Sequence, residues 1–306
     1  MSAASPLASP LMSSLGSAEA SGVDAEPGQA SALPLADSRA ASGPAQPNGG
    51  AIGLYARATA GFEERLARTV EVLRQVAEDF GPGAVQSTSL GVEDMIITDL
   101  IARHGLPIAL STLDTGRLHA ETLALIPAIE QRYGLKVQVF SPVQEQVLHF
   151  VRTHGEDAMY RSIELRKACC GVRKLEPLSR MLAGKQAWIT GLRREQSHNR
   201  ADVPFREPDG QGRTKVNPLA EWSWADVWHY VQQQAVPYNP LHDHFMPSIG
   251  CAPCTRAISV GEDFRAGRWW WESDDAKECG LHKSHGATQT PTSTSLPSSP
   301  RTGAPA

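Results

Sequence analysis

The sequence lacks the features of a membrane, secreted or nucleic-acid-binding protein. None of its apolar runs approaches the ~20 residues that a transmembrane helix needs. No Lys or Arg precedes Arg39, so the basic stretch of a signal peptide or a typical transit peptide is missing. The formal net charge is only -4 over 306 residues, which is too nearly neutral for nonspecific binding of nucleic acid. We therefore expect a cytoplasmic protein that binds neither membranes nor nucleic acid.

The two ends of the chain lack apolar periodicity. Residues 1–54 are dominated by Ala, Ser, Pro and Gly, and residues 284–306 are rich in Ser, Thr and Pro. Segments of such composition bury too little apolar surface to offset the entropy lost on folding. We expect a disordered arm at 1–54 and a disordered tail at 284–306. The central part, 55–283, is long enough for one α/β domain with a substantial core.

Strand and helix patterns alternate through this central part. Short apolar segments with the character of buried strands stand at residues 84–88, 107–113, 136–140 and 187–191. Helical periodicity is found at residues 62–80, 95–101, 120–133 and 222–231, and from residue 142 onward. Such alternation predicts a mostly parallel sheet covered by helices on both faces, with ligands at the carboxyl ends of the strands.

The five cysteines fall into two close pairs and one single residue. Cys169 and Cys170 are adjacent in RKACCGVRK, and Cys251 and Cys254 are two residues apart in GCAPC. Cys279 stands by itself in KECGLH. Paired thiols are typical of a metal-ligand set, and a thiol with basic neighbours can act as a nucleophile. The pattern therefore predicts four ligands and one nucleophile.

The spacing of the paired thiols bears on what they bind. Two adjacent residues of a helix point about 100° apart, so neighbouring thiolates diverge. A tetrahedral zinc needs its sulfurs only ~3.8 Å apart, whereas a 4Fe-4S cluster offers each cysteine a separate iron. This favours a cluster, with zinc as an alternative. The alternative without a metal is a disulfide or four buried thiols. Against it, Lys167, Arg173 and Lys174 stand close to the CC pair in the sequence, and such charges rarely surround inert cysteines.

Two expected strand ends carry candidate ligand chemistry. The first, STSLGVED, supplies hydroxyls and a flexible backbone at a helix N-terminus through Ser87, Ser89 and Gly91. This could hold a phosphate or sulfate, but simple helix capping by Ser89 explains the segment as well. The second, LDTGRLHAET, offers a place for a nucleoside through Asp114, Thr115 and Gly116. Asp-x-Gly is also an ordinary turn.

Taken together, these segments resemble the assimilatory adenylyl-sulfate and phosphoadenylyl-sulfate reductases. STSLGVED is similar to the family's modified pyrophosphate loop, LDTGRLHAET to its second nucleotide segment and TGLRREQSHNRA to its arginine-bearing substrate segment. CCGVRKLEPL, GCAPC, GRWWWE and KECGLH complete a resemblance that covers roughly residues 60–283 in order. It implies a Rossmann-like adenine nucleotide alpha hydrolase (PP-loop) fold and a role in sulfate assimilation and cysteine biosynthesis.

Within that family, paired cysteines characterise the cluster-bearing branch. This branch typically acts on adenosine 5'-phosphosulfate (APS), but cluster-containing enzymes that accept the 3'-phosphorylated substrate (PAPS) are a departure from it. The resemblance implies that Cys279 attacks the sulfonyl sulfur, that AMP leaves, and that thioredoxin releases sulfite from the S-sulfocysteine. No thioredoxin-like segment follows Cys279, so the reductant is expected to be external. Whether the protein forms a homo-oligomer is left open.

The resemblance also implies roles for single residues. One 4Fe-4S cluster per chain is assigned to Cys169, Cys170, Cys251 and Cys254. Cations that bind the substrate are expected at Lys174, Arg193, Arg265 and Arg268. His282 is expected to bind substrate or keep Cys279 ionised, with an exposed tail histidine as the alternative. The tryptophans of GRWWWE are expected to pack and to anchor the segment that carries Arg268.

Two other classes of protein remain as alternatives. ATP-using adenylating enzymes share the PP-loop fold, but STSLGVED lacks their SGGxDS form and KECGLH has no role in adenylation. A noncatalytic zinc module could be built on the four paired cysteines, and metal analysis of anaerobically purified protein would distinguish it.

Overall fold

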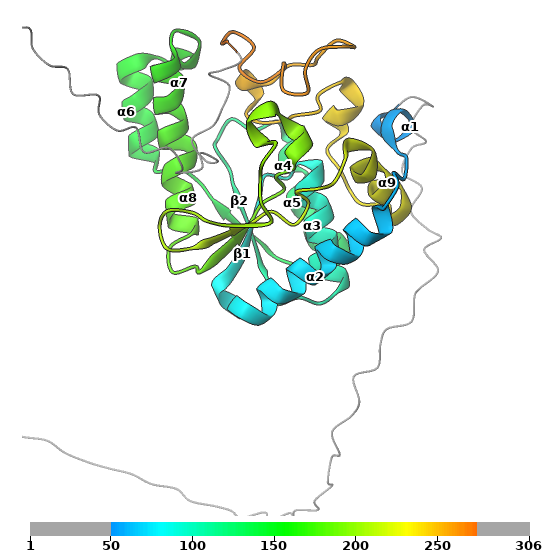
Figure 1. Ribbon diagram of the computed structural model, residues 1–306. Helices are drawn as coiled ribbons and strands as arrows, with labels where there is room; N and C mark the ends of the chain where they lie inside the picture. The colour runs from blue at the N-terminus through cyan, green and yellow to red at the C-terminus, as the bar shows by residue number, and fades with distance from the viewer. Residues whose placement is uncertain (1–49, 274–306) are drawn as a thin grey trace, which may run out of the picture. The chain divides into compact units, whose positions relative to one another are not determined.

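The computed structural model describes residues 50–273, which fold around one central sheet (Figure 1). The strand order is β3-β2-β1-β4-β6-β5. The strands are β1 (Ala84–Thr88), β2 (Ala109–Leu113), β3 (Val137–Phe140), β4 (Ala187–Ile189), β5 (Arg206–Pro208) and β6 (Thr214–Val216). All neighbours are parallel except β5, which pairs antiparallel with β6 at the edge. The predicted mostly parallel α/β sheet is confirmed.

Nine α-helices accompany these strands in the described part of the chain. They are α1 (Ala51–Tyr55), α2 (Phe62–Phe80), α3 (Val92–Arg103), α4 (Ala120–Leu123), α5 (Leu125–Tyr133), α6 (Gln144–His154), α7 (Ile163–Cys170), α8 (Glu176–Met181) and α9 (Trp224–Gln234). Helix α2 ends where expected, because Gly81 takes a positive φ of 47° and Pro82 follows it. None of the helices between residues 50 and 273 is long and apolar enough to cross a membrane.

Both faces of the sheet are covered, and the strands alternate between two buried clusters. In β1, Ala84 joins the large core while the next residue, Val85, packs in a smaller cluster. In β4, Ile189 faces the large core, and Trp188 joins the smaller cluster with Leu182. This period-2 alternation is the expected behaviour of strands buried on both sides.

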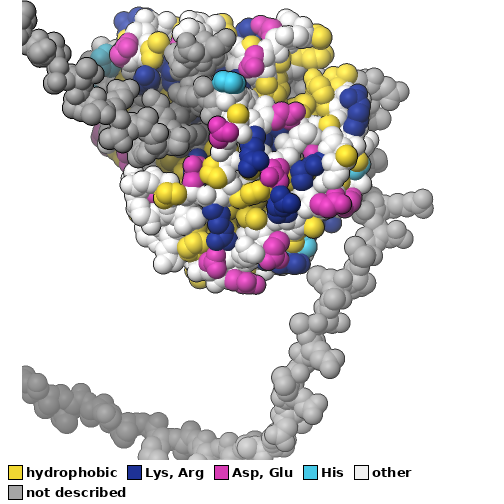
Figure 2. Space-filling view, viewed as in Figure 1, with side chains coloured by type: hydrophobic (Ala, Val, Ile, Leu, Met, Phe, Trp, Pro, Cys, Tyr) yellow, Lys and Arg dark blue, Asp and Glu magenta, His cyan; other side chains and the backbone are white. Residues whose placement is uncertain are grey.

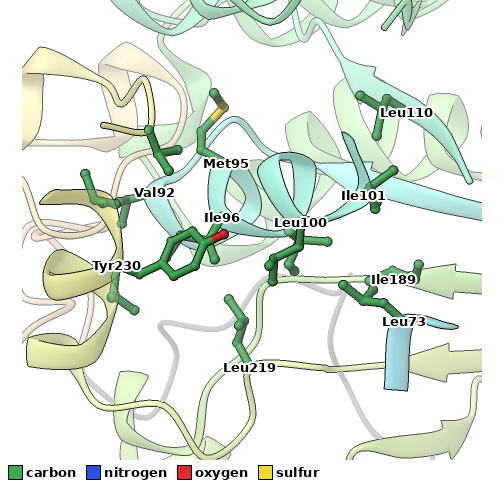
Figure 3. Close-up of a cluster of buried hydrophobic side chains, with 14 of the residues drawn as sticks. Leu73, Val92, Met95, Ile96, Leu100, Ile101, Leu110, Ile189, Leu219 and Tyr230 are labelled. Carbon is green, nitrogen blue, oxygen red and sulfur yellow. The ribbon is translucent and has the colours of Figure 1, made fainter. Parts of the chain in front are cut away.

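Helix α3 forms the centre of the large core (Figure 3). Every residue of this helix from Val92 to Ile101 is buried, so the helix has no solvent face over most of its length. Leu73 of α2 and Tyr230 of α9 pack in the same cluster, together with Ile189 of β4. The loop that precedes α3 is therefore attached to the most deeply buried helix of the domain.

Two expectations from the sequence need correction. The single helix predicted for residues 120–133 is two helices that break at Ala124. Pro127 lies in the first turn of α5, and it has no N–H to donate to the carbonyl of Leu123, so a continuous hydrogen-bond ladder is impossible there. The boundary at residue 55 is also wrong, because α1 begins at Ala51, which is buried against the core. Residues 1–49 and 274–306 lie outside the described part.

The topology places a crevice at one end of β1 and β4. From β1 the chain proceeds to β2 and β3 on one side of the sheet, whereas β4 and β6 extend it on the other side. The connections at the carboxyl ends of β1 and β4 therefore diverge, which is where doubly wound sheets bind ligands.

Candidate functional site

A cavity opens at this switch point, and we call it the nucleotide cavity. Its walls come from the carboxyl ends of three neighbouring strands and the loops that follow them. Among its lining residues are Ser87, Thr88, Ser89, Gly91, Leu113, Thr115, Thr190 and Gly191. The loop residues Ser87, Ser89 and Gly91 and the turn residue Thr115 were predicted for such a site. The loops after β4 add Thr190 and Gly191, which the sequence analysis had not singled out.

The loop before α3 is held by hydrogen bonds within the site. The amide and the hydroxyl of Ser89 both donate to Oδ2 of Asp94, at 2.7 and 2.6 Å. Leu90 takes a left-handed φ of 61°, which is uncommon for a residue with a side chain. Gly91 is the N-cap of α3, and no side chain caps the helix. Simple helix capping by Ser89 is therefore not what this loop does, since the Ser89 hydroxyl is used by Asp94.

Two buried carboxylates face the nucleotide cavity from the first turn of α3. Burial raises the pKa of Asp94 to about 6, Glu93 raises it further, and the Ser89 hydrogen bonds oppose the shift. Oε1 of Glu93 accepts hydrogen bonds from Nε of Arg193 at 3.0 Å and from Nε2 of Gln196 at 2.9 Å. The two acidic residues therefore differ, because Glu93 has an ionic partner and Asp94 has a hydroxyl partner.

Arg193 lies behind the wall of the nucleotide cavity instead of lining it. Its side chain is fully buried, pairs with Glu93 and Glu195, and faces the rings of Trp224 and Phe264. These contacts fix the Arg193 segment against α3. The structure therefore brings Arg193 to the site as a supporting residue.

Arg200, at the end of the same segment, does line the nucleotide cavity. Its Nη1 donates to Oε1 of Gln196 at 2.6 Å, and Gln196 in turn reaches Glu93. The sequence analysis named the segment TGLRREQSHNRA but not this residue. Three arginines stand in that segment, and their spacing does not show which one faces a ligand.

The LDTG segment connects the nucleotide cavity to the cysteines. Oδ1 of Asp114 accepts a hydrogen bond from the amide of Gly116 at 2.8 Å, and Gly116 takes a φ of 69°. This is the ordinary turn that the sequence allowed. Thr115, between them, is buried and lines the nucleotide cavity, with its Oγ1 at 3.2 Å from Sγ of Cys251. The turn thus places Thr115 where it lines the nucleotide cavity and also contacts Cys251.

All four paired cysteines line a second cavity, the cysteine cavity. Cys169 and Cys170 are the last two residues of α7, so the adjacent thiols do stand on a helix as expected. Cys251 and Cys254 flank a single turn in the chain. The cationic side chains around them are Arg117, Arg166, Arg173 and Lys174, and no acidic residue lines this cavity in the described part. Lys167, also expected near the pair, is exposed.

The thiols of the two pairs lie within electrostatic reach of one another. Burial raises the pKa of Cys254 to about 11, and Cys251 and Cys169 raise it further, while Arg268 and Lys174 oppose the shift. Burial also raises the pKa of Cys169, with Arg173 opposing. Within residues 50–273, no three His, Cys, Asp or Glu side chains form a group that could hold a single metal ion, whereas a 4Fe-4S cluster offers each cysteine a separate iron.

The nucleotide cavity and the cysteine cavity share two lining residues, Lys174 and Trp269. Lys174 belongs to a π-helical turn that continues α7 beyond the CC pair. A π-helical turn is an irregularity often found at functional sites. Arg265 and Arg268 also line the nucleotide cavity, so three of the four predicted cations meet at this junction.

Arg268 is fixed by a close backbone approach. Its guanidinium occupies the place that a side chain at residue 250 would take, so any residue larger than glycine there would displace the Arg268 side chain. Nη1 of Arg268 donates to the carbonyl of Ile249 at 3.2 Å, and its Nε donates to the carbonyl of Cys254 at 3.3 Å. The cation and the second cysteine pair are therefore parts of one packed unit.

Trp269 anchors this unit, as the sequence predicted for the tryptophans of GRWWWE, whereas Trp270 is exposed and does not fit that prediction. The side chain is 1% exposed, and the guanidinium groups of Arg166, Arg265 and Arg268 lie 4.5, 5.8 and 4.8 Å from its ring. Arg166 also makes two hydrogen bonds to Glu272, at 2.9 and 2.8 Å, in a buried ion pair. Neither Arg166 nor Glu272 was singled out from the sequence, since an isolated Arg or Glu usually indicates a solvated surface.

The segment that the sequence predicts to be catalytic follows Glu272 in the chain. Cys279 and His282 are outside the described residues. Glu272 precedes Cys279 by seven residues in the sequence, and the Arg166–Glu272 ion pair holds the last residues of the described part against α7.

The parallel sheet, its switch point and the loop before α3 define an α/β nucleotide-binding domain of PP-loop-like fold. Residues 83–257, more than half of the chain, match the model of the phosphoadenosine phosphosulfate reductase domain. The chain belongs to this family.

Relatives of known name and structure agree with this assignment. The chain is 53% identical over 228 residues to an adenosine 5'-phosphosulfate reductase of Allochromatium vinosum, covering 74% of this chain and 89% of the relative. It is 55% identical over 197 residues to the enzyme of the same name from Burkholderia cepacia, covering 64% and 79%. The crystal structure of a phosphoadenylyl-sulfate reductase from Candida auris, in a phosphate complex, is similar with a TM-score of 0.53 and 26% identity. It covers 66% of this chain and all of the other.

We predict that Glu272→Gln strongly destabilises the domain. The substitution removes the carboxylate charge that is buried against the guanidinium of Arg166, and breaking a buried pair in this way costs about 3–5 kcal/mol. Denaturant unfolding of the anaerobic protein would measure the change. Glu130→Gln is the matched control, because the Glu130–Lys136 pair is exposed and its loss should leave the unfolding midpoint unchanged. Equal midpoints for the two variants would contradict the prediction.

Proposed function

We propose that the protein reduces APS to sulfite and AMP. The observation that carries the proposal is the junction at Lys174 and Trp269, where a cavity with a phosphate-type loop meets a cavity lined by four thiols. A nucleotide in the first cavity would have its anionic end beside the cations of this junction. The names of the curated relatives support APS as the substrate and sulfate assimilation as the setting.

In this proposal the thiolate of Cys279 attacks the sulfur of the sulfonate. A sulfur–sulfur bond forms, the bond from sulfur to the bridging oxygen breaks, and AMP leaves with that electron pair. Lys174, Arg265 and Arg268 stabilise the charge that develops on the departing phosphate. His282 keeps Cys279 ionised or binds the substrate.

An external dithiol completes the cycle. One thiol of thioredoxin attacks Sγ of Cys279, releases sulfite and forms a mixed disulfide, and its second thiol then frees Cys279. The dithiol is oxidised to a disulfide while the sulfonate sulfur is reduced by two electrons. Thioredoxin, at about −270 mV, suits this step.

A 4Fe-4S cluster fits the chemistry of the cysteine cavity. Its donors are Cys169, Cys170, Cys251 and Cys254, and the surrounding cations complement the negative charge of four thiolates. When bound, the cluster would supply fixed negative charge beside Lys174 and hold the two cysteine pairs together. Arg173 supports the same arrangement from the protein side, because its Nη1 donates to the carbonyl of Thr115 at 2.8 Å.

The carboxylates of α3 support APS over PAPS. Both carboxylates line the nucleotide cavity, but Glu93 is paired with Arg193, so Asp94 is the one whose negative charge would repel a further phosphate on the ribose if that phosphate lies near it. PAPS remains the alternative substrate.

We predict that kcat/KM for APS exceeds that for PAPS in an anaerobic assay with thioredoxin. The like charge of Asp94 should contribute to the preference, so Asp94→Asn should narrow it by roughly tenfold, about 1.4 kcal/mol. The measurement is sulfite release at pH 8, above the raised pKa of Asp94, where this carboxyl is ionised. Equal or reversed preference in the wild type would assign the protein to the PAPS-reducing alternative.

We also predict that anaerobically purified protein is brown and contains about four irons per chain. Cys170→Ser should lose most of the iron because it removes one ligand, and Cys279→Ser is the control that should keep it. Metal analysis and the visible absorption spectrum test both variants. Stoichiometric zinc without iron would overturn the cluster proposal.

Cys279→Ser should abolish sulfite release while leaving nucleotide affinity nearly intact. A serine hydroxyl stays protonated at neutral pH and is a far weaker nucleophile than a thiolate. Wild-type protein given APS without thioredoxin should gain one sulfonate, which mass spectrometry should locate on the peptide with Cys279. A sulfonate on Cys251 or Cys254, or comparable turnover by the variant, would require new roles for the five cysteines.

A further inference from the structure

A histidine in the wall of the nucleotide cavity has no role in the chemistry above. His242 lies in the short helical turn Pro240–His244, and it is 5% exposed. Neither ring nitrogen has a hydrogen-bond partner of normal geometry in the described part of the chain, and the backbone of Met246, which raises the pKa of the ring, makes only a weak contact that does not meet this geometry. A buried polar group without a partner costs free energy, so a residue in this state is one that a ligand can satisfy.

The imidazole is held in place by its neighbours. Its ring lies edge-on to Trp228, with centroids 5.4 Å apart, and to Trp224 at 6.1 Å. Oδ1 of Asn239 accepts from the amide of Leu241 at 3.0 Å, and its Nδ2 donates to Oγ1 of Thr122 at 2.9 Å, which fixes the turn. The ring is therefore preorganised before any ligand arrives.

The charge state of His242 limits what it can recognise. Burial lowers its pKa to about 4, with Glu93 opposing, so the ring is neutral near pH 7. A neutral imidazole offers one donor and one acceptor. A phosphate or sulfate offers acceptors and calls for cations, which the site supplies at Lys174, Arg265 and Arg268. The hydroxyls of a ribose and the edges of an adenine offer both donors and acceptors.

We propose that His242 hydrogen-bonds to the uncharged nucleoside half of the bound substrate and contributes to selection for it. The inference rests on the proposed function insofar as the ligand is an adenine nucleotide, but it concerns binding and does not require turnover. The nucleoside then lies toward α9 and the turn at Pro240–His244, and the phosphosulfate lies toward the cysteine cavity.

Equilibrium binding of AMP to the full-length, anaerobically purified protein tests this role. His242→Phe keeps a ring between Trp224 and Trp228 but removes both nitrogens, so the dissociation constant of AMP should rise about tenfold. His242→Gln restores one donor and one acceptor and should recover most of the affinity. His244→Phe, on the exposed side of the same turn, should bind like the wild type.

Thermal melting of each variant shows whether the fold is intact. If the Phe variant does not fold, AMP binding is measured with His242→Met, which also removes both ring nitrogens. Unchanged AMP affinity in a folded His242→Phe or His242→Met protein would overturn the proposal, since a buried water would then satisfy the ring. Failure of the glutamine variant to recover affinity would also count against it. Sulfite release by the wild type is measured separately, so an AMP-binding protein that makes no sulfite would refute the proposed function and leave this inference standing.

Discussion

The packing of three guanidinium groups around Trp269 is the interaction on which both cavities depend. Arg166, Arg265 and Arg268 all lie within 6 Å of this ring, where like charges repel and the ring face attracts each of them. Buried cations need nearby negative charge or well-placed acceptors. Glu272 supplies the charge for Arg166, and backbone carbonyls accept from Arg268. Arg265 and Arg268 line the nucleotide cavity and Arg166 lines the cysteine cavity, so the packing around Trp269 places cations beside both.

A second constraint is the burial of α3. Because this helix has almost no solvent face, Glu93 and Asp94 in its first turn must find partners inside the protein. Arg193 and Gln196 satisfy Glu93, and Ser89 satisfies one oxygen of Asp94. The same contacts draw the segment after β4 and the loop after β1 toward each other, so they shape the nucleotide cavity. The surface differs from this interior: the face in Figure 2 mixes basic and acidic side chains. Exposed ion pairs such as Arg68–Glu221 also occur in the described part of the chain.

The sequence predicts those helix ends and strands that depend on neighbouring residues alone. The end of α2 follows from Gly81 and Pro82, and four strands follow from short apolar runs. Strands β5 and β6 were missed because they are three residues long and partly polar. The break at Ala124 was missed because apolar periodicity outweighed Pro127.

The candidate site likewise has residues that the sequence could predict and residues that it could not. Paired cysteines and hydroxyl-rich loops have recognisable spacing, and the structure brings the four cysteines to one cavity. The arginines have no such recognisable spacing. Arg193 and Arg200 stand in one segment, and only tertiary packing decides that Arg200 lines the nucleotide cavity while Arg193 is buried behind it. His242 gives no local signal at all, since its burial depends on Trp224 and Trp228 of another helix.

The segments that carry the second cysteine pair and the substrate cations cannot move independently. Thr255 pairs with Arg268 in an isolated β-bridge, and the carbonyl of Cys254 accepts from the amide of Trp269 at 3.3 Å. A side chain at residue 267 would clash with the carbonyl of Arg256, so the two stretches of backbone are in direct contact. Any displacement of Cys251 and Cys254 therefore displaces Arg268 as well. If the proposed cluster holds the four thiols together, it would therefore also set the position of Arg268, and the cysteines could matter for the proposed reaction without taking part in electron transfer.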